Sequence, residues 1–445
     1  MAVLAICASA IVVGIIAGQG KWMFLPAVAL VPLFWRWPVE MALGGVVLML
    51  PFEGISLIGG GERGLMSIAF VISIWVIFAV GIVSGRLQRP SSTTIWCGGF
   101  IAWVAASILW AVRPDISLAH ASTVIALFLF FLVVSSFRVT PTEFKWIIIL
   151  TIAGGVGGGL YSLYQFHSGM TFGTPGTHDT VRATLISGET YVNPNRFAVR
   201  LLLPLAFCIA GFLSARSRLV KFAALACAGV ISLSLLLIQS RGTLIAAGVL
   251  VLVFCVRLKI RRGLIPVLLV VCAMIAATPA IFSRFQTNDR GAGRFDIWLV
   301  GWAAMKHYPI MGAGLGNFPV VYNDFAGEGQ NLYMKSENDS HNIYIEVGVE
   351  EGMIGLLLML MTVKSQFGLL SKCRKRLSGP PTMLVACEAG FCALLASGVF
   401  GNILWDKTFW MAWVLLAFAI TLQKSSAAQA SAVAASGGLE TKEAF

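Results

Sequence analysis

Apolar runs of about 20 residues recur along almost the whole sequence, separated by short polar stretches. A bilayer core about 30 Å thick selects segments of roughly 17 to 25 apolar residues. The composition agrees, because 58% of the residues are hydrophobic and only 12% are charged, values that a water-soluble chain of 445 residues could not carry. We therefore predict an all-α integral membrane protein with about 12 to 14 transmembrane helices.

The excess of basic residues gives the chain a net charge of +12, but these residues are spread among short loops between the apolar runs. Membrane topology accounts for such a distribution, so nucleic-acid binding is not expected. The nine cysteines lie in apolar segments or, in the case of Cys373, in a basic loop. They form no CxxC pair and no Cys/His cluster, so we expect buried thiols and no metal site.

Three basic clusters predict how the chain is oriented in the membrane: RSRLVK (216–221), RLKIRR (257–262) and KCRKR (372–376). The positive-inside rule places all three in the cytoplasm, together with GRLQRP (85–90). The first two clusters flank one long apolar run that has Arg241 near its middle. Because both ends of this run are cytoplasmic, it must be a hairpin of two helices, and Arg241 lies at its outer turn.

The domain organisation follows from this map. Residues 1–422 form one polytopic transmembrane domain, and the stretch 1–18, which lacks the basic n-region of a signal peptide, is its first helix. Two larger polar segments, 166–195 and 283–340, fall on the outer side, and the second is expected to be a large periplasmic loop. Residues 423–445 are small, polar and low in complexity, which predicts a disordered cytoplasmic tail.

Most basic residues that this map places outside are arginines, with few lysines. Arginine makes paired hydrogen bonds to phosphate oxygens, whereas lysine acts as a point charge. The bias indicates an anionic, phosphate-bearing ligand at the outer leaflet. The alternative is that each arginine reaches lipid headgroups or pairs with an acid such as Asp289 or Asp296. The outer arginines are Arg63, Arg113, Arg182, Arg196, Arg200, Arg241, Arg284, Arg290 and Arg294, and the outer lysines are Lys306, Lys335 and Lys407.

The periodicity of residues 295–307 predicts an amphipathic helix with a tryptophan-rich face suited to the membrane interface. Arg294 lies at its first turn, where free backbone N–H groups and a guanidinium together favour an anion. An ion pair with a nearby acid is the alternative role for Arg294.

Two glycine-rich stretches have structural interpretations. The stretch MGAGLGNF (311–318) neither follows a strand nor opens a βαβ unit, so it predicts a tight turn after Pro309 and no dinucleotide site. The stretch GGVGGG (154–159) lies in an apolar segment, where small residues permit close helix packing.

The stretch from Asn338 to Leu360 opens another helix from the outside. Asp339 or Ser340 is expected to cap this helix, which puts His341 and Asn342 in its first turn. A histidine there can accept a proton from a sugar hydroxyl, and a purely structural role is the alternative. The acids that follow at helical spacing, Glu346, Glu350 and Glu351, are expected to pair with arginines.

Residues 191–207 open a further helix, capped by Asn193 or Asn195. Arg196 and Arg200 are four residues apart and share one face of its first turns. One of them can join an anion site, and contact with lipid headgroups is the alternative for each.

Four stretches together resemble the O-antigen ligases and O-antigen polymerases, membrane glycosyltransferases that assemble bacterial surface polysaccharides. They are NPNRFAVRLLLPL (193–205), SRGTLIAAG (240–248), GRFDIWLVGWAAMKHYPIMGAGLGNF (293–318) and SHNIYIEVGVEEGMIGLLL (340–358). The resemblance implies an all-helical GT-C-like fold in the bacterial inner membrane, with a periplasmic loop that caps a lateral cleft. It also implies transfer, without a metal or other cofactor, from an undecaprenyl-diphosphate-linked oligosaccharide to a sugar hydroxyl at the periplasmic face.

By motif match, Arg241 and Arg294 correspond to arginines that bind the diphosphate, and His341 corresponds to the candidate base. Arg196, Arg200 and Asn342 are further candidates to bind the diphosphate or the glycan. Two arginines that hold its charge make a diphosphate a good leaving group, and direct attack by the acceptor inverts the anomeric centre. The outer loops contain no DxD pattern, so no metal ligand set is expected.

Two other functions are compatible with a polytopic chain. A transporter or flippase of lipid-linked oligosaccharides would carry ionisable residues at mid-membrane depth, whereas here the distinctive charges are predicted at the outer rim. A structural scaffold would leave the outer arginines and His341 without a shared role. If the protein is an enzyme, the sequence is compatible with two acceptors. A ligase would transfer the glycan to a lipid A-core, and a polymerase would transfer it to a growing glycan chain.

Overall fold

The computed structural model describes residues 33–54, 65–173, 181–187, 190–260, 294–328, 339–377 and 381–440. Almost all regular structure in these residues is α-helical, which confirms the predicted all-α class. The α-helices are α3 (Pro38–Met49), α4 (Leu65–Val83), α5 (Ser92–Ala106), α6 (Pro114–Ser135), α7 (Pro141–His167), α8 (Pro194–Arg200), α9 (Leu202–Ser214), α10 (Arg218–Ile238), α11 (Arg241–Arg257), α14 (Arg294–His307), α15 (Phe318–Phe325), α16 (Ile343–Glu350), α17 (Gly352–Arg374), α18 (Thr382–Ser397) and α19 (Lys407–Glu440). A two-stranded antiparallel hairpin joins β1 (Ile186–Ser187) to β2 (Thr190–Tyr191).

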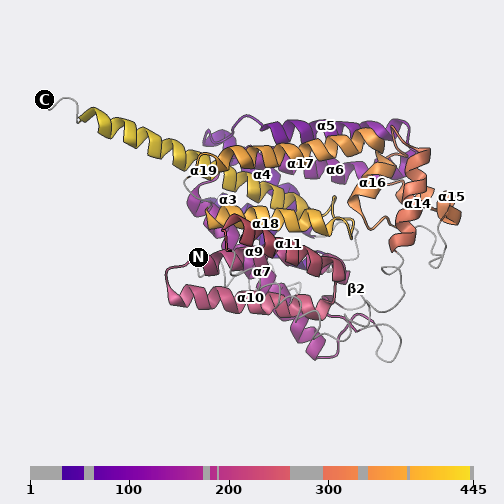
Figure 1. The fold of residues 1–445 in the computed structure, drawn as a ribbon, viewed down its shortest axis with the longest axis horizontal. Coiled ribbons are helices and arrows are strands. Elements are labelled where there is room, and N and C mark those ends of the chain that lie inside the picture. Colours follow the sequence, from indigo (N-terminus) through magenta and orange to yellow (C-terminus); the bar gives the residue numbers. More distant parts are fainter. Residues whose placement is uncertain are drawn as a thin grey trace.

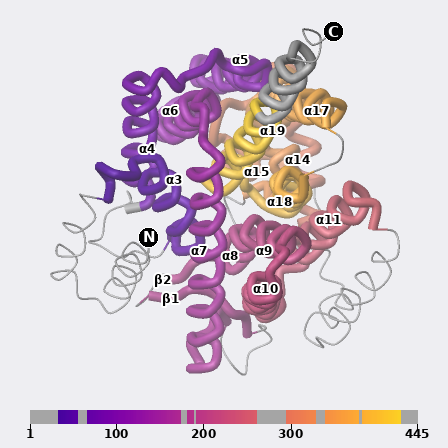
Figure 2. Tube along the Cα trace, turned by 90° about the vertical axis from the view of Figure 1, so that its left-hand side faces the viewer, coloured from indigo at the N-terminus to yellow at the C-terminus, as the bar shows by residue number. Residues whose placement is uncertain are grey.

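Within the described residues, eight helices are long and apolar enough to cross a membrane, so the chain is a multi-pass membrane protein. The predicted first helix, 1–18, lies outside the described residues, and the total of about 12 to 14 helices stays a prediction. Figure 1 shows most of the long helices lying side by side, with α14 and α15 gathered at one end of this bundle. Figure 2 views the bundle from the opposite end.

The glycine-rich stretch of α7 lets neighbouring helices approach closely, as predicted. A Cβ atom on Gly154 would lie 2.5 Å from the carbonyl oxygen of Leu48 at the end of α3. A Cβ on Gly155 would lie 2.4 Å from the Pro204 ring on α9. Any side chain at these two positions would therefore force α3 and α9 away from α7.

One end of the bundle, which we call the basic end, gathers the predicted cytoplasmic clusters. Arg257, where α11 ends, and Arg374, where α17 ends, both pair with the buried carboxylate of Glu388. The shared partner places two of the three basic clusters at the same end of the bundle. At the start of α7, Glu143 accepts a hydrogen bond of 2.9 Å from Arg86.

The other end, which we call the pocket end, contains the turn between α10 and α11. Helix α10 ends at Ile238 and α11 begins at Arg241, which confirms the predicted hairpin. The turn is tight because Gln239 adopts φ +54°, a left-handed conformation that ends α10. Arg241 is therefore the first residue of its helix and lies at the end of the bundle, not at its centre.

The sidedness of the two ends can be tested by cysteine labelling. We expect a single cysteine at the exposed Asp324 of α15 to react with a membrane-impermeant thiol reagent in intact cells, in a Cys-free background. A cysteine at the exposed Arg376, at the basic end, serves as the control and should react only after lysis. The opposite labelling pattern would reverse the predicted orientation.

The C-terminal residues differ from the prediction. Helix α19 continues to Glu440, so much of the segment 423–445 is helical where the sequence predicted disorder. The physical reason is that this stretch is rich in alanine and extends a helix that is already nucleated, which removes the main cost of helix formation.

Candidate functional site

A polar cavity of about 190 Å³ opens at the pocket end. Five parts of the chain form its walls: the start of α8, the α10–α11 turn with the start of α11, the first residue of α14, the segment just before α16, and the end of α18 with its connection to α19. The lining residues with polar side chains are Asn193, Asn195, Arg196, Ser240, Thr243, Arg294, Asp339, His341, Ser397 and Asn402.

The structure brings three of the predicted site residues, Arg196, Arg294 and His341, into this one cavity. Arg241 lies at its edge: the neighbouring Ser240 and Gly242 line the cavity, and Arg241 itself is half-buried between them. Among the other predicted outer arginines, Arg113 makes an exposed ion pair of 2.9 Å with Asp115. Arg63, Arg284, Arg290 and Asp289 lie outside the described residues.

His341 has an unusual backbone conformation. Its φ of +49° lies in the left-handed region, which costs a residue other than glycine about 1 to 3 kcal/mol unless the surroundings impose it. Here both flanking residues are fixed, because the Asn342 N–H donates to the Ser340 hydroxyl at 3.1 Å. Ser340 is itself buried, with the side chains of Glu346 and Asn402 at 3.2 and 2.9 Å from its hydroxyl. The chain therefore presents the imidazole on a rigid kink at the cavity wall.

This geometry corrects the predicted cap of the following helix. Asn342, and neither Asp339 nor Ser340, is the N-cap of α16, and its Oδ1 accepts from the backbone N–H groups of Tyr344 and Ile345. His341 consequently precedes the helix and is not part of its first turn. Asn342 is buried and is absent from the cavity wall, so a role in binding substrate is not supported.

The surroundings of His341 lower the pKa of its imidazole below the usual 6.5. Burial is the largest cause, because it disfavours the charged ring, and the positive charge of Arg294 acts in the same direction. Asp339 opposes this shift but does not reverse it. The imidazole is therefore neutral at physiological pH and can accept a proton.

Arg200 does not share the cavity with Arg196, although the two were predicted on one helix face. Its guanidinium is buried and pairs with Glu53 at 2.9 Å and with Asp406 at 3.1 Å. Lys407 completes the cluster by pairing with Glu53. The predicted role of Arg200 in substrate binding is thus not supported; Arg200 instead ties the end of α3 to the start of α19.

We expect Arg200→Ala to destabilise the protein by about 3 to 5 kcal/mol, because it removes a buried guanidinium from between two carboxylates and leaves Asp406 without its paired cation. The measurement is thermal unfolding of the purified protein in detergent. Arg196→Ala is the matched control: this arginine is exposed on the same short helix, so the unfolding temperature should change little. Equal unfolding temperatures for Arg200→Ala and the wild type would show that the buried cluster has no structural role.

The three acids of the α16 region were predicted to pair with arginines, and the structure shows other partners. Glu350 accepts a hydrogen bond of 3.0 Å from the backbone N–H of Phe318, and Glu351 accepts from the Ser107 hydroxyl. The glycine-rich turn 311–318 packs here, as the tight turn that was predicted: Gly314 has φ +93° and donates to the Glu350 carbonyl at 2.7 Å. Burial raises the pKa of the Glu350 carboxyl to about 7.

Helix α14 is apolar on two faces, and the predicted amphipathic pattern is therefore only partly correct. Ile297, Val300 and Ala304 are buried, in one cluster with residues of α15 and α16. Phe295 and Trp302 are both more than half exposed and form part of the tryptophan-rich face that was predicted for the membrane interface. Arg294, at the first position of α14, reaches the cavity from between these faces.

Two parts of the cavity were not predicted from the sequence. Asn195 was expected only as a possible helix cap, whereas the N-cap of α8 is Asn193 and Asn195 lines the cavity. The other part is the connection that contains Phe400 and Asn402. This connection has no charged residue between positions 398 and 405, and its small and apolar residues gave no chemical signal.

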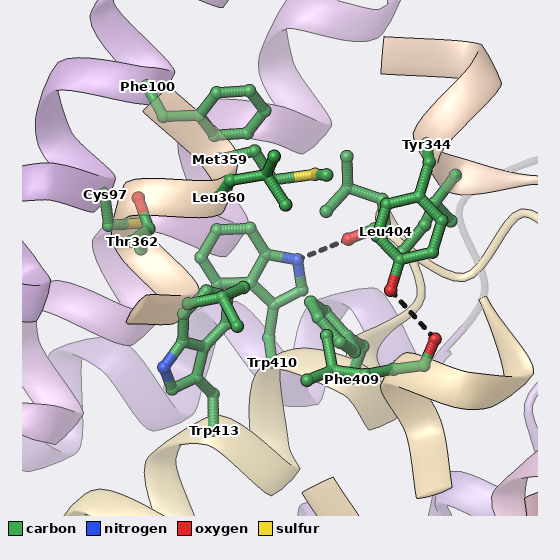
Figure 3. A pocket seen from close by; sticks show the side chains of 13 residues that line it. Cys97, Phe100, Tyr344, Met359, Leu360, Thr362, Leu404, Phe409, Trp410 and Trp413 are labelled. Carbon is green, nitrogen blue, oxygen red and sulfur yellow. Dashed lines mark hydrogen bonds between the residues drawn. The ribbon is translucent and has the colours of Figure 1, made fainter. Parts of the chain in front are cut away.

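A second, apolar cavity of about 60 Å³ lies between α5, α16, α17, α18 and α19 (Figure 3). Its polar side chains are used inside the protein: Trp410 donates to the Leu404 carbonyl at 2.7 Å, and Tyr344 donates to the Leu395 carbonyl at 3.0 Å (Figure 3). These two donors are therefore already used by backbone carbonyls.

The family model described as O-antigen ligase matches residues 226–360. This span contains Arg241, Arg294 and His341, and it confirms the resemblance found in the sequence motifs. Asn195, Arg196 and the connection between α18 and α19 lie outside the match. No curated protein matches the chain.

Proposed function

We propose that the protein is a membrane glycosyltransferase of the O-antigen ligase or polymerase type. It transfers a glycan from an undecaprenyl-diphosphate-linked donor to a sugar hydroxyl, at the periplasmic face of the bacterial inner membrane. The observation that supports this proposal best is the shared cavity of His341, Arg294 and Arg196, with Arg241 at its edge. A proton acceptor beside several arginines is the set of groups that such a transfer requires.

The proposed reaction uses these groups in one displacement. The acceptor hydroxyl gives its proton to the neutral imidazole of His341 as its oxygen attacks the anomeric carbon. The bond between that carbon and the diphosphate oxygen breaks, and its electron pair leaves with the diphosphate. Arg294, Arg241 and Arg196 stabilise the negative charge on the leaving group. Because attack and departure occur on opposite sides of the carbon, the product has inverted configuration.

The proposal assigns no metal ion to this reaction. Each arginine side chain can bind two phosphate oxygens directly through a pair of N–H groups. It thereby supplies the charge stabilisation that a divalent cation gives in other phosphate sites. Within the described part of the chain, no three His, Cys, Asp or Glu side chains are grouped so that they could hold a metal ion.

The position of the charges favours an enzyme over a flippase. A flippase that moves a charged headgroup through the bilayer is expected to have ionisable groups at mid-membrane depth. The arginines of the buried ion pairs in the described residues stand at helix ends instead: Arg257 and Arg374, which pair with Glu388 at the basic end, and Arg200, which pairs with Asp406 at the pocket end.

The experiment that tests the proposal is reconstitution of the purified protein with a synthetic undecaprenyl-diphosphate oligosaccharide, alone and together with core lipid. A ladder of products from the donor alone indicates a polymerase, and one shifted core-lipid band indicates a ligase. Movement of the donor across the vesicle membrane without formation of a glycosidic bond would contradict the enzyme proposal and support a flippase.

A further inference from the structure

Arg182 connects two walls of the polar cavity. Its side chain is buried, with an exposed fraction of 8% for the residue. Its Nε donates to the carbonyl of Ile238, the last residue of α10, at 2.8 Å. Its Nη2 donates to Oδ1 of Asn195, in the first turn of α8, also at 2.8 Å. Arg182 thus holds Asn195 at a fixed position relative to the hairpin turn that presents Arg241.

This contact determines which way the Asn195 amide is turned. A guanidinium has only donor groups, so the Asn195 atom that faces it must be the oxygen. The amide nitrogen, on the other branch of the same planar group, is therefore turned away from Arg182. Asn195 lines the cavity, and no described residue accepts a hydrogen bond from its Nδ2. Two N–H donors are thus held in place without an acceptor among the described residues.

We propose that Asn195 binds the donor substrate, with its Nδ2 group donating a hydrogen bond to a diphosphate oxygen. The inference rests on the proposed function and adds a ligand residue to it. The neighbouring groups favour a phosphate oxygen as the acceptor, because Arg196 and Arg294 line the same cavity and attract an anion there. Arg182 is a positioning residue: it occupies the amide oxygen, so that only N–H groups face the anion.

Asn195→Asp tests this inference sharply. The aspartate keeps the size of the side chain and still offers Arg182 an acceptor, but it replaces both N–H donors by a carboxylate oxygen. We expect the dissociation constant for farnesyl diphosphate, measured by calorimetry on the purified protein, to rise about 10- to 100-fold. Glycan transfer from the undecaprenyl-diphosphate donor should show a matching rise in KM.

Two further variants separate the loss of the donor groups from the added charge. Asn195→Ser removes the amide without adding charge and should weaken binding of the same probe about 10-fold. Asn193→Asp adds the same charge two residues away while its carboxylate still caps α8, and its effect should be much smaller than that of Asn195→Asp. The two aspartate variants should retain the unfolding temperature of the wild type, because Asn195→Asp still offers Arg182 an acceptor and Asn193→Asp still caps α8.

The outcomes distinguish this inference from the proposed function. If the wild type binds farnesyl diphosphate and Asn195→Ser binds it equally well, Asn195 is not a ligand, while the proposed function stands. Equal losses in Asn193→Asp and Asn195→Asp would likewise reduce the effect to charge and overturn the inference. A wild type that does not bind the diphosphate at all would overturn both.

Discussion

His341→Ala is expected to abolish detectable glycan transfer while it leaves the affinity for the donor largely intact. A general base contributes about 10²- to 10⁴-fold to the rate, and the contacts to the diphosphate come from other residues. The measurement is single-turnover transfer together with donor binding, on protein in nanodiscs. His120→Ala is the control, since His120 is exposed on α6 and is not part of the cavity wall.

His341→Asn makes the test independent of the backbone. Asparagine tolerates the left-handed conformation that His341 adopts, with φ +49°, better than most residues, but it cannot accept the proton at neutral pH. Its rate should therefore be as low as that of His341→Ala. If His341→Asn binds donor and transfers within a few-fold of the wild-type rate, His341 is a structural residue at the entrance to α16.

The pH dependence of kcat/KM for the wild type should report the protonation of His341. The active form of His341 is the neutral ring, so kcat/KM is constant above its pKa and falls about tenfold per pH unit below it. Burial and Arg294 lower this pKa, so the fall should begin below the usual 6.5 of histidine. A profile that falls instead through a pH above 6.5 would contradict the role of His341. Added EDTA should leave the profile unchanged.

Arg294→Lys and Arg241→Lys are expected to slow transfer by about 30- to 1000-fold, which corresponds to about 2 to 4 kcal/mol of transition-state stabilisation. Lysine keeps the charge but loses the planar pair of N–H donors that fits two phosphate oxygens. Arg294 lines the cavity and Arg241 lies at its edge, so the larger effect is expected at Arg294.

Arg113→Lys is the matched control for these two variants. Arg113 pairs with Asp115 in solvent at the pocket end and does not line the cavity. The transfer rate of Arg113→Lys should therefore stay near that of the wild type. Near wild-type turnover in both Arg294→Lys and Arg241→Lys would remove the arginines from the proposed mechanism.

The amino-acid sequence alone determined the membrane class and the hairpin that presents Arg241. Both follow from local properties: the length of an apolar run fixes a membrane crossing, and basic clusters at both ends of a double-length run require a turn between them. The motifs that contain Arg294 and His341 were also recognisable, because the start of a helix leaves a local pattern in the sequence, and the structure confirms a helix after each residue.

Only the tertiary structure decided which of these side chains meet. Arg196 and Arg200 are equivalent by spacing, yet the first lines the cavity and the second is buried against Glu53 and Asp406. The three- to four-residue periodicity of a helix tells which residues share a face, but not which distant segment packs against each turn of that face. Glu53 and Asp406 are more than 140 residues from Arg200 in the sequence.

The same limit applies to the orientation of individual groups. The left-handed backbone of His341 depends on the contact of Ser340 with Asn402 from the connection between α18 and α19. The direction of the Asn195 amide depends on Arg182, which is itself held by the end of α10. Hydrogen bonds between segments that are distant in sequence impose both conformations, and local sequence preferences therefore could not predict them.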